Sequence, residues 1–268
     1  MKEDNFFLGQ IEDKIAQCEN KFIATHTGFM DLHQQSLARV FCKKNFVQVF
    51  TQKQEEVPEM AEERPALRTL FYGGYEQAER VILLNLPEYA DLKNENPLVI
   101  VRAKVSEKSK SLTHRDYLGS LIGLGMKREM IGDILVRDDG ADIIVLAEIA
   151  DFILQNYCKA GRVSLSLEKL DISKLIVPEA KVREITDTVA SLRLDSIVAS
   201  GFSLSRGKAA EAITRGIVFV NNMETVKPDF QLKEGDKISL RGKGKVCLRE
   251  VGGKSRKDRQ YIAIEKYE

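Results

Sequence analysis

The chain has 268 residues, of which 43% are hydrophobic and 30% are charged, and its formal net charge is +1. This length and apolar content indicate folded cores in two or three domains rather than one. A net charge so close to zero argues, taken alone, against a nucleic-acid partner.

The four cysteines (Cys18, Cys42, Cys158 and Cys247) lie far apart, and no pair has the spacing of a metal or redox motif. We therefore expect no disulfide framework, no metal and no cofactor. Residues 2–5 are charged or polar with no apolar stretch behind them, and no run of about 18 apolar residues occurs in the sequence. These features predict a cytoplasmic protein without a membrane partner.

Residues 1–64 are expected to form a helical N-terminal region. Ile11, Ile15 and Cys18 recur at helical spacing, and a second apolar stripe runs along residues 31–41. Residues 52–64 are polar and acidic and include a proline, so we interpret them as a linker or an exposed loop.

Residues 65–178 are expected to form a central domain that opens with strands at 67–71 and 81–86. The pattern that follows predicts the order β-α-β-β-α-β, which is the ferredoxin-like or RRM-like arrangement. RNA-recognition sheets carry stacking aromatics, whereas the expected central strands here have none, so the likeness is weak evidence for RNA binding. The expected elements are strand 98–105, helix 115–124 with Thr113 as its N-cap, strands 131–136 and 143–146, helix 148–157 and strand 162–167.

Residues 179–268 are expected to form a small module that contains two adjacent helices. The first carries Arg193 and ends near Gly201, because glycine suits a helix C-terminus. The second spans 206–215, and the hydroxyl of Ser205 is suited to cap it. The fold class predicted for the whole chain is therefore α+β, with helices first, the ferredoxin-like domain second and this module last.

The second helix of the module presents cations. Lys208 and Arg215 share one of its faces, seven residues apart. Arg206 lies at its start, where backbone amides already favour an anion such as a phosphate. Together with Arg193, these side chains are expected to offer several cations to one strip of surface.

Predicted strands at 217–220 and 237–240 come after the second helix, and a short basic segment directly follows the later one. Arg241, Lys243 and Lys245 alternate with two glycines, which would let the backbone approach a phosphate chain with a charge at every second position. A flexible hairpin tip is the alternative interpretation. Four further cations at residues 254–259 form a basic loop that is also explained as ordinary solvated surface.

The balance of charge differs between the two ends of the chain. From Val182 to Glu268 the sequence holds 17 Lys and Arg against 12 Asp and Glu, whereas the preceding residues hold 24 against 28. A basic module behind an acidic front is typical of a protein that binds a polyanion through one part only. Ordinary scatter of surface charge is the simpler alternative.

Residues 192–241 resemble the S4 domain, the α-L RNA-binding module named after a small-subunit ribosomal protein. The likeness rests on R-L-D at 193–195, S-R at 205–206, G-I-V-F-V-N at 216–221 and G-D at 235–236, in that order. The resemblance implies paired helices packed on a short sheet that bind structured RNA through their exposed face. The RNA-binding residues expected from the resemblance and the charge pattern are Arg193, Ser205, Arg206, Lys208, Arg215, Arg241, Lys243 and Lys245.

The whole chain resembles the YlmH family of bacterial S4-domain proteins. The segments that carry this likeness are FYGGYEQAER at 71–80 and HRDYLGSLIGLG at 114–125. The resemblance implies a monomeric factor that contacts rRNA or tRNA on the large ribosomal subunit, where an obstructed nascent chain is held on tRNA. It further implies a role in ribosome-associated quality control, and a link to cell division.

Enzymatic alternatives have little support in the motifs. Asp195 in R-L-D superficially matches the catalytic aspartate of pseudouridine synthases, but it lies inside the S4-like helix, so we interpret it as structural or as an orienter of nearby cations. His114-Arg115-Asp116 resembles a kinase triplet without the glycine-rich loop that kinases need. The leading hypothesis is a non-enzymatic RNA-binding protein. An RNA-modifying enzyme with its active site in the central domain, and a protein-interaction scaffold, remain the alternatives.

Overall fold

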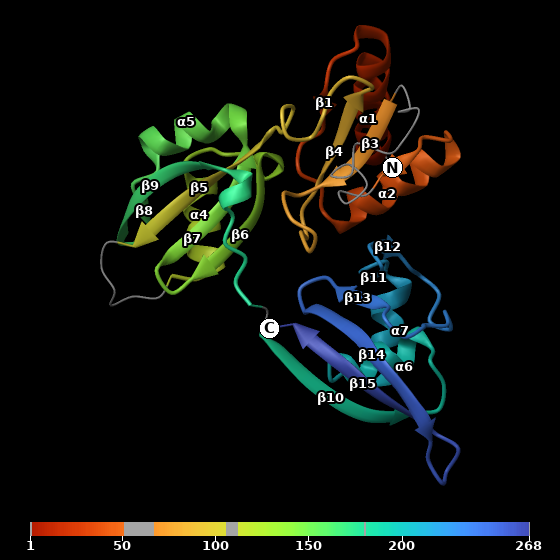
Figure 1. The fold of residues 1–268 in the computed structure, drawn as a ribbon. Coiled ribbons are helices and arrows are strands. Elements are labelled where there is room, and N and C mark those ends of the chain that lie inside the picture. The colour runs from red at the N-terminus through yellow and green to blue at the C-terminus, as the bar shows by residue number, and fades with distance from the viewer. Residues whose placement is uncertain (1, 51–66, 106–111, 180, 268) are drawn as a thin grey trace. The chain divides into compact units, whose positions relative to one another are not determined.

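The computed structural model describes residues 2–50, 67–105, 112–179 and 181–267, and it has the α+β class expected (Figure 1). The described residues form two compact units, Met1–Pro178 and Glu179–Glu268. This division falls where the sequence placed the start of the terminal module. The linker expected at 52–64, and with it the expected boundary after residue 64, lies outside the described residues.

The first part of unit 1 is a four-stranded sheet, ordered β1-β4-β3-β2, with two helices against it. Apolar side chains of both helices, including Ile11 and Ala38, form one cluster with Val81 and Leu83. Every residue of β4 is buried, because the opposite face of this sheet packs on Leu98 and its neighbours in the central sheet. The elements are α1 (Lys2–Lys21), β1 (Thr25–His26), α2 (Leu32–Lys44), β2 (Val49–Phe50), β3 (Leu67–Tyr72) and β4 (Ile82–Pro87).

This arrangement differs from the sequence-based division in one respect. The strands expected at 67–71 and 81–86 exist, but they pair with β1 and β2 of the N-terminal region rather than joining the central sheet. The N-terminal region is therefore a helix-and-sheet layer and not helical alone. Local sequence pattern specifies a strand, whereas its partners depend on contacts far away in the chain.

The second part of unit 1 is a five-stranded sheet, ordered β6-β7-β5-β9-β8, in which all neighbours are antiparallel. Tyr117 and Leu121 of α4 and Ile153 of α5 pack on one face of it. The order β5-α4-β6-β7-α5-β9 is the βαββαβ order expected, with β8 as an added short strand. The bounds are β5 (Leu98–Val105), α4 (His114–Gly123), β6 (Ile131–Arg137), β7 (Gly140–Leu146), α5 (Ala147–Asn156), β8 (Lys159–Ala160) and β9 (Val163–Asp171), with short 3-10 helices η1 (Arg128–Met130) and η2 (Ile172–Lys174).

The segment 71–80, one of the two that resemble the YlmH family, fastens the two sheets of unit 1 together. The carboxylate of Asp133 on β6 accepts hydrogen bonds from the Tyr75 hydroxyl at 2.8 Å and from the backbone nitrogens of Glu79 and Arg80 at 2.7 and 3.1 Å. The Arg80 guanidinium donates to three backbone carbonyls, including that of Ile131 at 3.0 Å. These bonds link the first sheet of unit 1 to the central sheet.

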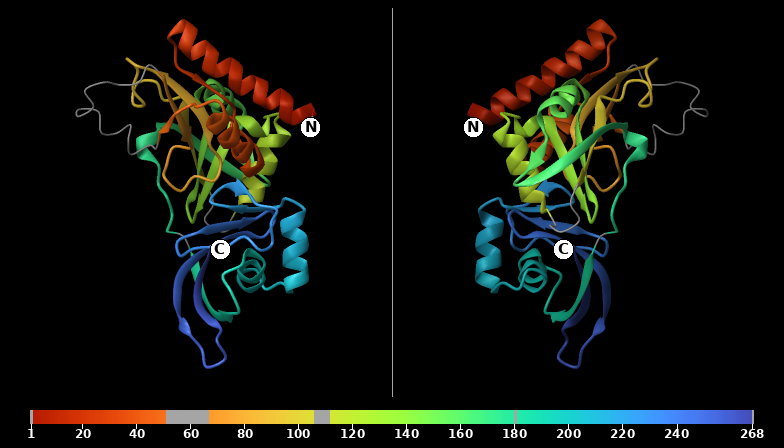
Figure 2. Two further views of the ribbon diagram at one scale, coloured as in Figure 1. Left: turned by 90° about the vertical axis from the view of Figure 1, so that its right-hand side faces the viewer. Right: turned by 90° about the vertical axis from the view of Figure 1, so that its left-hand side faces the viewer.

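Unit 2 is a six-stranded antiparallel sheet, ordered β10-β15-β14-β13-β11-β12, with α6 and α7 on one side of it (Figure 2). Ile197 of α6 and Ile213 of α7 share a buried cluster with Val246 and Ile264 of the sheet. A Cβ at Gly201 would lie 3.2 Å from Val246, so glycine lets α6 lie close on β14. The bounds are β10 (Val182–Val189), α6 (Leu194–Gly201), α7 (Arg206–Thr214), β11 (Val218–Val220), β12 (Met223–Glu224), β13 (Lys237–Leu240), β14 (Gly244–Lys254) and β15 (Gln260–Tyr267).

The four cysteines occupy different surroundings. Cys18, Cys42 and Cys247 are buried and Cys158 is exposed, and all four are free thiols. Burial raises the pKa of Cys18 and of Cys42 to about 11, and it also raises the pKa of Cys247.

No helix within the described ranges combines the length and the apolar character that crossing a membrane requires.

Candidate nucleic-acid interface

A buried carboxylate between α6 and α7 organises the first group of cations. Both oxygens of Asp195 accept hydrogen bonds from Arg193, at 3.2 and 3.0 Å, and from Arg206, at 3.3 and 3.2 Å. Ser196 adds a hydroxyl donor at 3.3 Å. One acid thus holds two arginines from two helices, and this is the orienting role expected from the sequence.

Local sequence explains why these groups meet. Arg193 is the N-cap residue of α6, and the loop that precedes β13 holds this end, because Leu194 donates its N–H to the carbonyl of Phe230. Ser205 caps α7 by accepting the backbone N–H of Lys208 at 3.3 Å. Arg206 is therefore the first residue of α7 and lies beside the start of α6. The Ser205 hydroxyl is committed to the cap in this structure.

The ionisation state of Asp195 favours this arrangement. Burial alone would raise its pKa, but the hydrogen bonds from Arg193 and Arg206 outweigh burial and hold the pKa below the usual value. The same pairing raises the pKa of Arg193. At neutral pH the acid is therefore ionised. Each guanidinium has five N–H donors, and those that do not bond to Asp195 remain available to a phosphate.

A second group of cations lies away from Asp195. Lys208 and Arg215 share one face of α7, as expected, but Arg206 precedes Lys208 by two residues and so points roughly 200° around the helix axis. Arg215 lies roughly 14 Å along the axis from Arg206. It also forms an ion pair with Glu211 at 3.7 Å. The structure therefore divides the single strip of cations expected from sequence into two faces.

The basic segment 241–245 lies at the C-terminal end of α7. Arg241 donates its N–H to the carbonyl of Ile217, and Lys243 donates to Leu240, so residues 241–243 form a tight turn between β13 and β14. The amino group of Lys245 on β14 lies 5.6 Å from the centre of the Tyr267 ring. Through its bond to Ile217, Arg241 lies close to the C-terminal end of α7, where Arg215 is, and not at the start of α7, where Arg206 is.

A polar pocket that the sequence pattern does not predict opens beside Arg206. It has a volume of about 300 Å³, and its lining includes Ser196, Ser200, Thr188, Arg206 and Arg259. Arg259 lies in the turn between β14 and β15, within the basic loop expected at 254–259, but the sequence interpretation included neither of the two flanking strands. The signal was present: Val246 and Leu248, and then Ile262 and Ile264, alternate with polar or small residues in the manner of half-buried strands.

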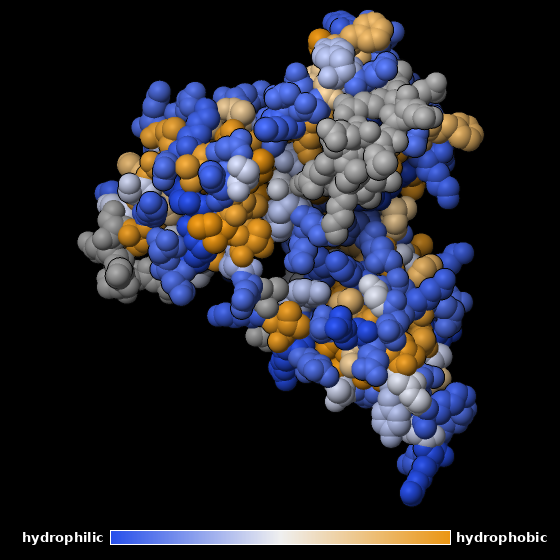
Figure 3. All heavy atoms as spheres, viewed as in Figure 1, coloured by the Kyte–Doolittle hydropathy of each residue, from blue (hydrophilic) through white to orange (hydrophobic). Residues whose placement is uncertain are grey.

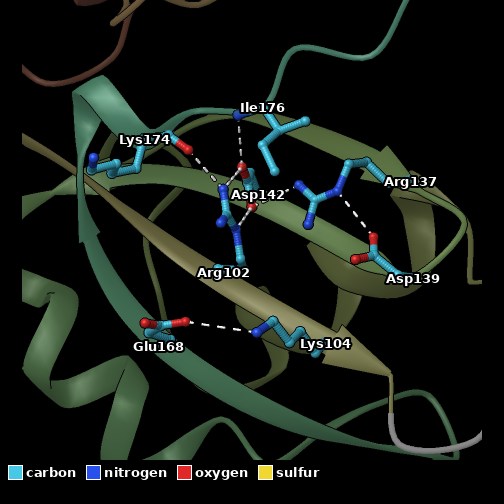
Figure 4. Close-up of polar contacts among 8 residues, drawn as sticks. All are labelled: Arg102, Lys104, Arg137, Asp139, Asp142, Glu168, Lys174 and Ile176. Carbon is cyan, nitrogen blue, oxygen red and sulfur yellow. Dashed lines mark hydrogen bonds and ion pairs between the residues drawn. The ribbon is translucent and has the colours of Figure 1, made fainter.

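Unit 1 offers a different charged surface, on the face of the central sheet opposite α4 and α5 (Figure 4). Ala141 and Ile143 pack toward the helices, so Asp142 between them points to the other face. The Asp142 carboxylate accepts two hydrogen bonds from Arg102, at 2.7 and 2.8 Å, and lies 2.7 Å from Arg137. The strands of this sheet carry no aromatic residue, so base stacking of the RRM kind has no side chain here.

The chain itself occupies part of this face. The backbone N–H of Ile176 donates to Asp142 at 3.0 Å, and Arg102 donates to the carbonyl of Lys174 at 2.7 Å (Figure 4). Burial would raise the pKa of Asp142, but its hydrogen bonds with Arg102, Arg137 and Ile176 hold the pKa below the usual value. The segment that leads out of unit 1 is thus attached to the sheet by an ionised, fully buried acid.

Comparison with known proteins agrees with this geometry. A family model described as "Putative RNA-binding domain in YlmH" matches residues 92–174, and the S4 domain model matches residues 192–238. Ribosome-associated protein quality control protein P2 of Bacillus subtilis (strain 168) is 37% identical over 197 residues, which are 73% of this chain and 77% of that protein. The chain belongs to the YlmH family.

Among solved structures, the cell division protein ylmH from Streptococcus pneumoniae is similar to this YlmH-family chain. It is 20% identical, the match covers 65% of this chain and 94% of that one, and the TM-score is 0.47. The two family models place one RNA-binding domain in each unit of this YlmH-family protein. RNA binding is therefore the general function of the family to which the chain belongs.

Proposed function

We propose that this protein docks on structured RNA of the ribosome through unit 2, as a non-enzymatic factor in ribosome-associated quality control. Its target is the large subunit that holds an obstructed nascent chain on tRNA, and it acts in the cytoplasm as a monomer. The support for the process comes from the name of the Bacillus subtilis relative, a ribosome-associated quality control protein. The resemblance of segments 71–80 and 114–125 to the YlmH family implies a further link to cell division.

One observation carries the RNA-binding part of the proposal: the two arginines held by Asp195. Guanidinium groups that are pre-oriented lose less side-chain entropy when they bind a phosphate than free side chains do. Phosphate contacts supply much of the affinity of RNA-binding proteins and make it depend strongly on salt. Lys208 and Arg215, with the turn at 241–245, add a second set of phosphate contacts on the other face of α7.

The same geometry argues against catalysis by Asp195. A nucleophile or general base needs an oxygen that can reach the substrate, whereas both oxygens of this carboxylate accept hydrogen bonds from arginines. The alternative of an RNA-modifying enzyme would then need a site in unit 1. A pocket of about 420 Å³ there, lined by His26, Glu129 and Glu148 among others, is the place to test it.

The experiment that tests the proposal is sedimentation of cell extract through sucrose gradients at low and at high salt, followed by crosslinking and sequencing of the bound RNA. We expect the protein to migrate with the large subunit at low salt and to leave it as salt rises. Migration only at the top of the gradient at low salt would contradict the ribosomal function.

Two variants refine this experiment. R206A combined with R215A removes one cation from each face of α7 and should abolish the association, while the control K43A combined with K44A removes the same charge from exposed positions at the end of α2. An equal loss of ribosome association in both variants would mean that total charge, and not the cations on α7, drives binding. A nucleoside modification missing from the RNA of a deletion strain would favour the enzymatic alternative.

A further inference from the structure

The β14–β15 hairpin extends beyond the S4 motif. β14 pairs with β13 only over residues 244–247 but with β15 as far as Lys254, and β10 pairs along the outer edge of β15. The family model for S4 ends at residue 238, so this hairpin lies outside the part of the chain that defines the motif. In Figure 1 its tip projects past the rest of unit 2. We call residues 249–261 the arm.

The tip of the arm is an ordered turn. Ser255 donates its N–H to the carbonyl of Arg259 at 2.7 Å, and its hydroxyl accepts the Arg259 N–H at 3.1 Å. Asp258 has a φ of 56°, the left-handed conformation that aspartate tolerates in turns, and donates its N–H to Ser255. The side chains at this tip are therefore presented from a defined backbone.

The tip is strongly basic, and the far end of unit 2 in Figure 3 is correspondingly hydrophilic. Residues 254–259 contain four cations and a single acid, Asp258, which pairs with Lys254 at 2.7 Å. Arg256 and Lys257 are exposed, and neither forms an ion pair with any residue that the structure describes. Two cations at the tip are thus available to an external anion.

Arg259 connects the arm to the helices. Its guanidinium donates to the Thr188 hydroxyl at 3.1 Å and also to the Thr188 carbonyl, which fixes it at the end of β10. Arg259 and Arg206 line the same pocket of about 300 Å³, with Ser196 and Ser200 among the residues that line it as well. The pocket also holds the Asp187 carboxylate, which accepts a hydrogen bond from the Ser200 hydroxyl at 2.7 Å. Two arginines and this single acid are therefore the charged groups that line the pocket between α7 and the tip of the arm.

We propose that the arm is a second RNA-contacting element. The sugar-phosphate backbone crosses the pocket between Arg206 and Arg259, and Arg256 and Lys257 bind phosphates further along the strand. A protein partner fits less well, because protein interfaces have an apolar centre and residues 254–259 have no apolar side chain. This inference rests on the proposed function and adds a contact that the S4 motif does not contain.

The test compares R256A combined with K257A against the wild-type protein and against K43A combined with K44A. Affinity for purified large ribosomal subunits is measured by pelleting at several salt concentrations. Loss of two phosphate contacts should weaken binding about 10-fold or more and lower the slope of log affinity against log salt by about two. The control should match the wild type, and both variants should melt like it, because all four side chains are exposed.

The outcomes separate this inference from the proposed function. If the wild type binds and the arm variant has the same affinity and slope, the arm contact is wrong and the S4 function stands. If the wild type itself does not bind, both are wrong. A photoreactive group attached at K257C in a C158S background should crosslink to RNA, and a crosslink to ribosomal protein alone would overturn the inference.

Discussion

Asp142 in unit 1 and Asp195 in unit 2 are two versions of one arrangement, a buried carboxylate that holds two arginines. They differ in how much of each arginine side chain is exposed to solvent. The side chains of Arg102 and Arg137 are only 14% and 11% exposed, whereas those of Arg193 and Arg206 are 34% and 56% exposed. In unit 1 a second acid, Asp139, also pairs with Arg137 at 3.0 Å, so two acids balance two arginines, whereas in unit 2 part of the positive charge remains available. Exposure of the cations, and not their pairing with an acid, separates a structural cluster from a binding surface.

The largest effect that this comparison predicts is on stability. D142A should leave Arg102 without its buried acid and Arg137 with only the exposed Asp139, and lower the free energy of unfolding of unit 1 by about 3–5 kcal/mol. Hydrogen exchange measured by mass spectrometry on the full chain reads each unit separately. The control D151A removes an exposed partner of Lys169 and should cost no more than about 1 kcal/mol. Equal losses in the two variants would contradict a structural role for Asp142.

The second prediction contrasts one arginine from each cluster. R206A should lower affinity for large subunits about 10-fold, since a hydrogen bond to a charged group contributes about 1.5–3 kcal/mol. R137A should leave affinity within about 2-fold of the wild type, because a buried guanidinium has no phosphate to bind. Pelleting assays at one fixed salt concentration measure both. A loss of affinity in R137A as large as in R206A would mean that the central sheet also binds RNA.

The third prediction concerns the cap of α7. S205A should destabilise unit 2 by about 1 kcal/mol through loss of the N-cap, and S205N should restore the stability, since asparagine is an equally good cap. Urea unfolding measures the change. If S205N restores stability but not RNA affinity, the hydroxyl also contacts RNA, as the S4 resemblance implies; if S205A keeps full affinity, Ser205 only caps the helix.

The smallest effect should come from mild acid. The pKa of Asp142 is lower in the folded protein than its ordinary value, so its contribution to stability is complete above that value and is lost as pH falls through the folded pKa. The difference in unfolding free energy between wild type and D142N should therefore be equal at pH 7 and pH 5 and should shrink only below about pH 4. A difference that already shrinks between pH 7 and pH 5 would contradict the lowered pKa.

Local pattern in the sequence was sufficient for part of this molecule. α7 with its Ser205 cap, and the end of α6 at Gly201, follow from helix-terminus signals, and the position of Asp195 inside a helix favoured a structural or orienting role over a catalytic one. The βαββαβ order followed from alternation and turn residues in the same way. The type of an element and the position of its ends can be predicted from residues within one turn or one strand.

The sequence pattern did not predict which strands and side chains pair when they lie far apart in the chain. Arg102 and Asp142 are 40 residues apart and meet only because β5 pairs with β7 in one register. The strands expected at 67–71 and 81–86 exist as β3 and β4, but the sequence pattern placed them in the central domain, whereas their further partners β1 and β2 both lie earlier in the chain. Only the folded sheet brings Arg206 and Arg259 to one pocket.

The distribution of thiols makes unit 1 simple to label. Cys158 is exposed on the segment after α5, while burial raises the pKa of the other three cysteines and keeps them protonated at neutral pH. A maleimide dye should therefore attach at one position without any engineered cysteine. Energy transfer from that dye to a labelled tRNA on the large subunit would then measure the distance between unit 1 and the tRNA.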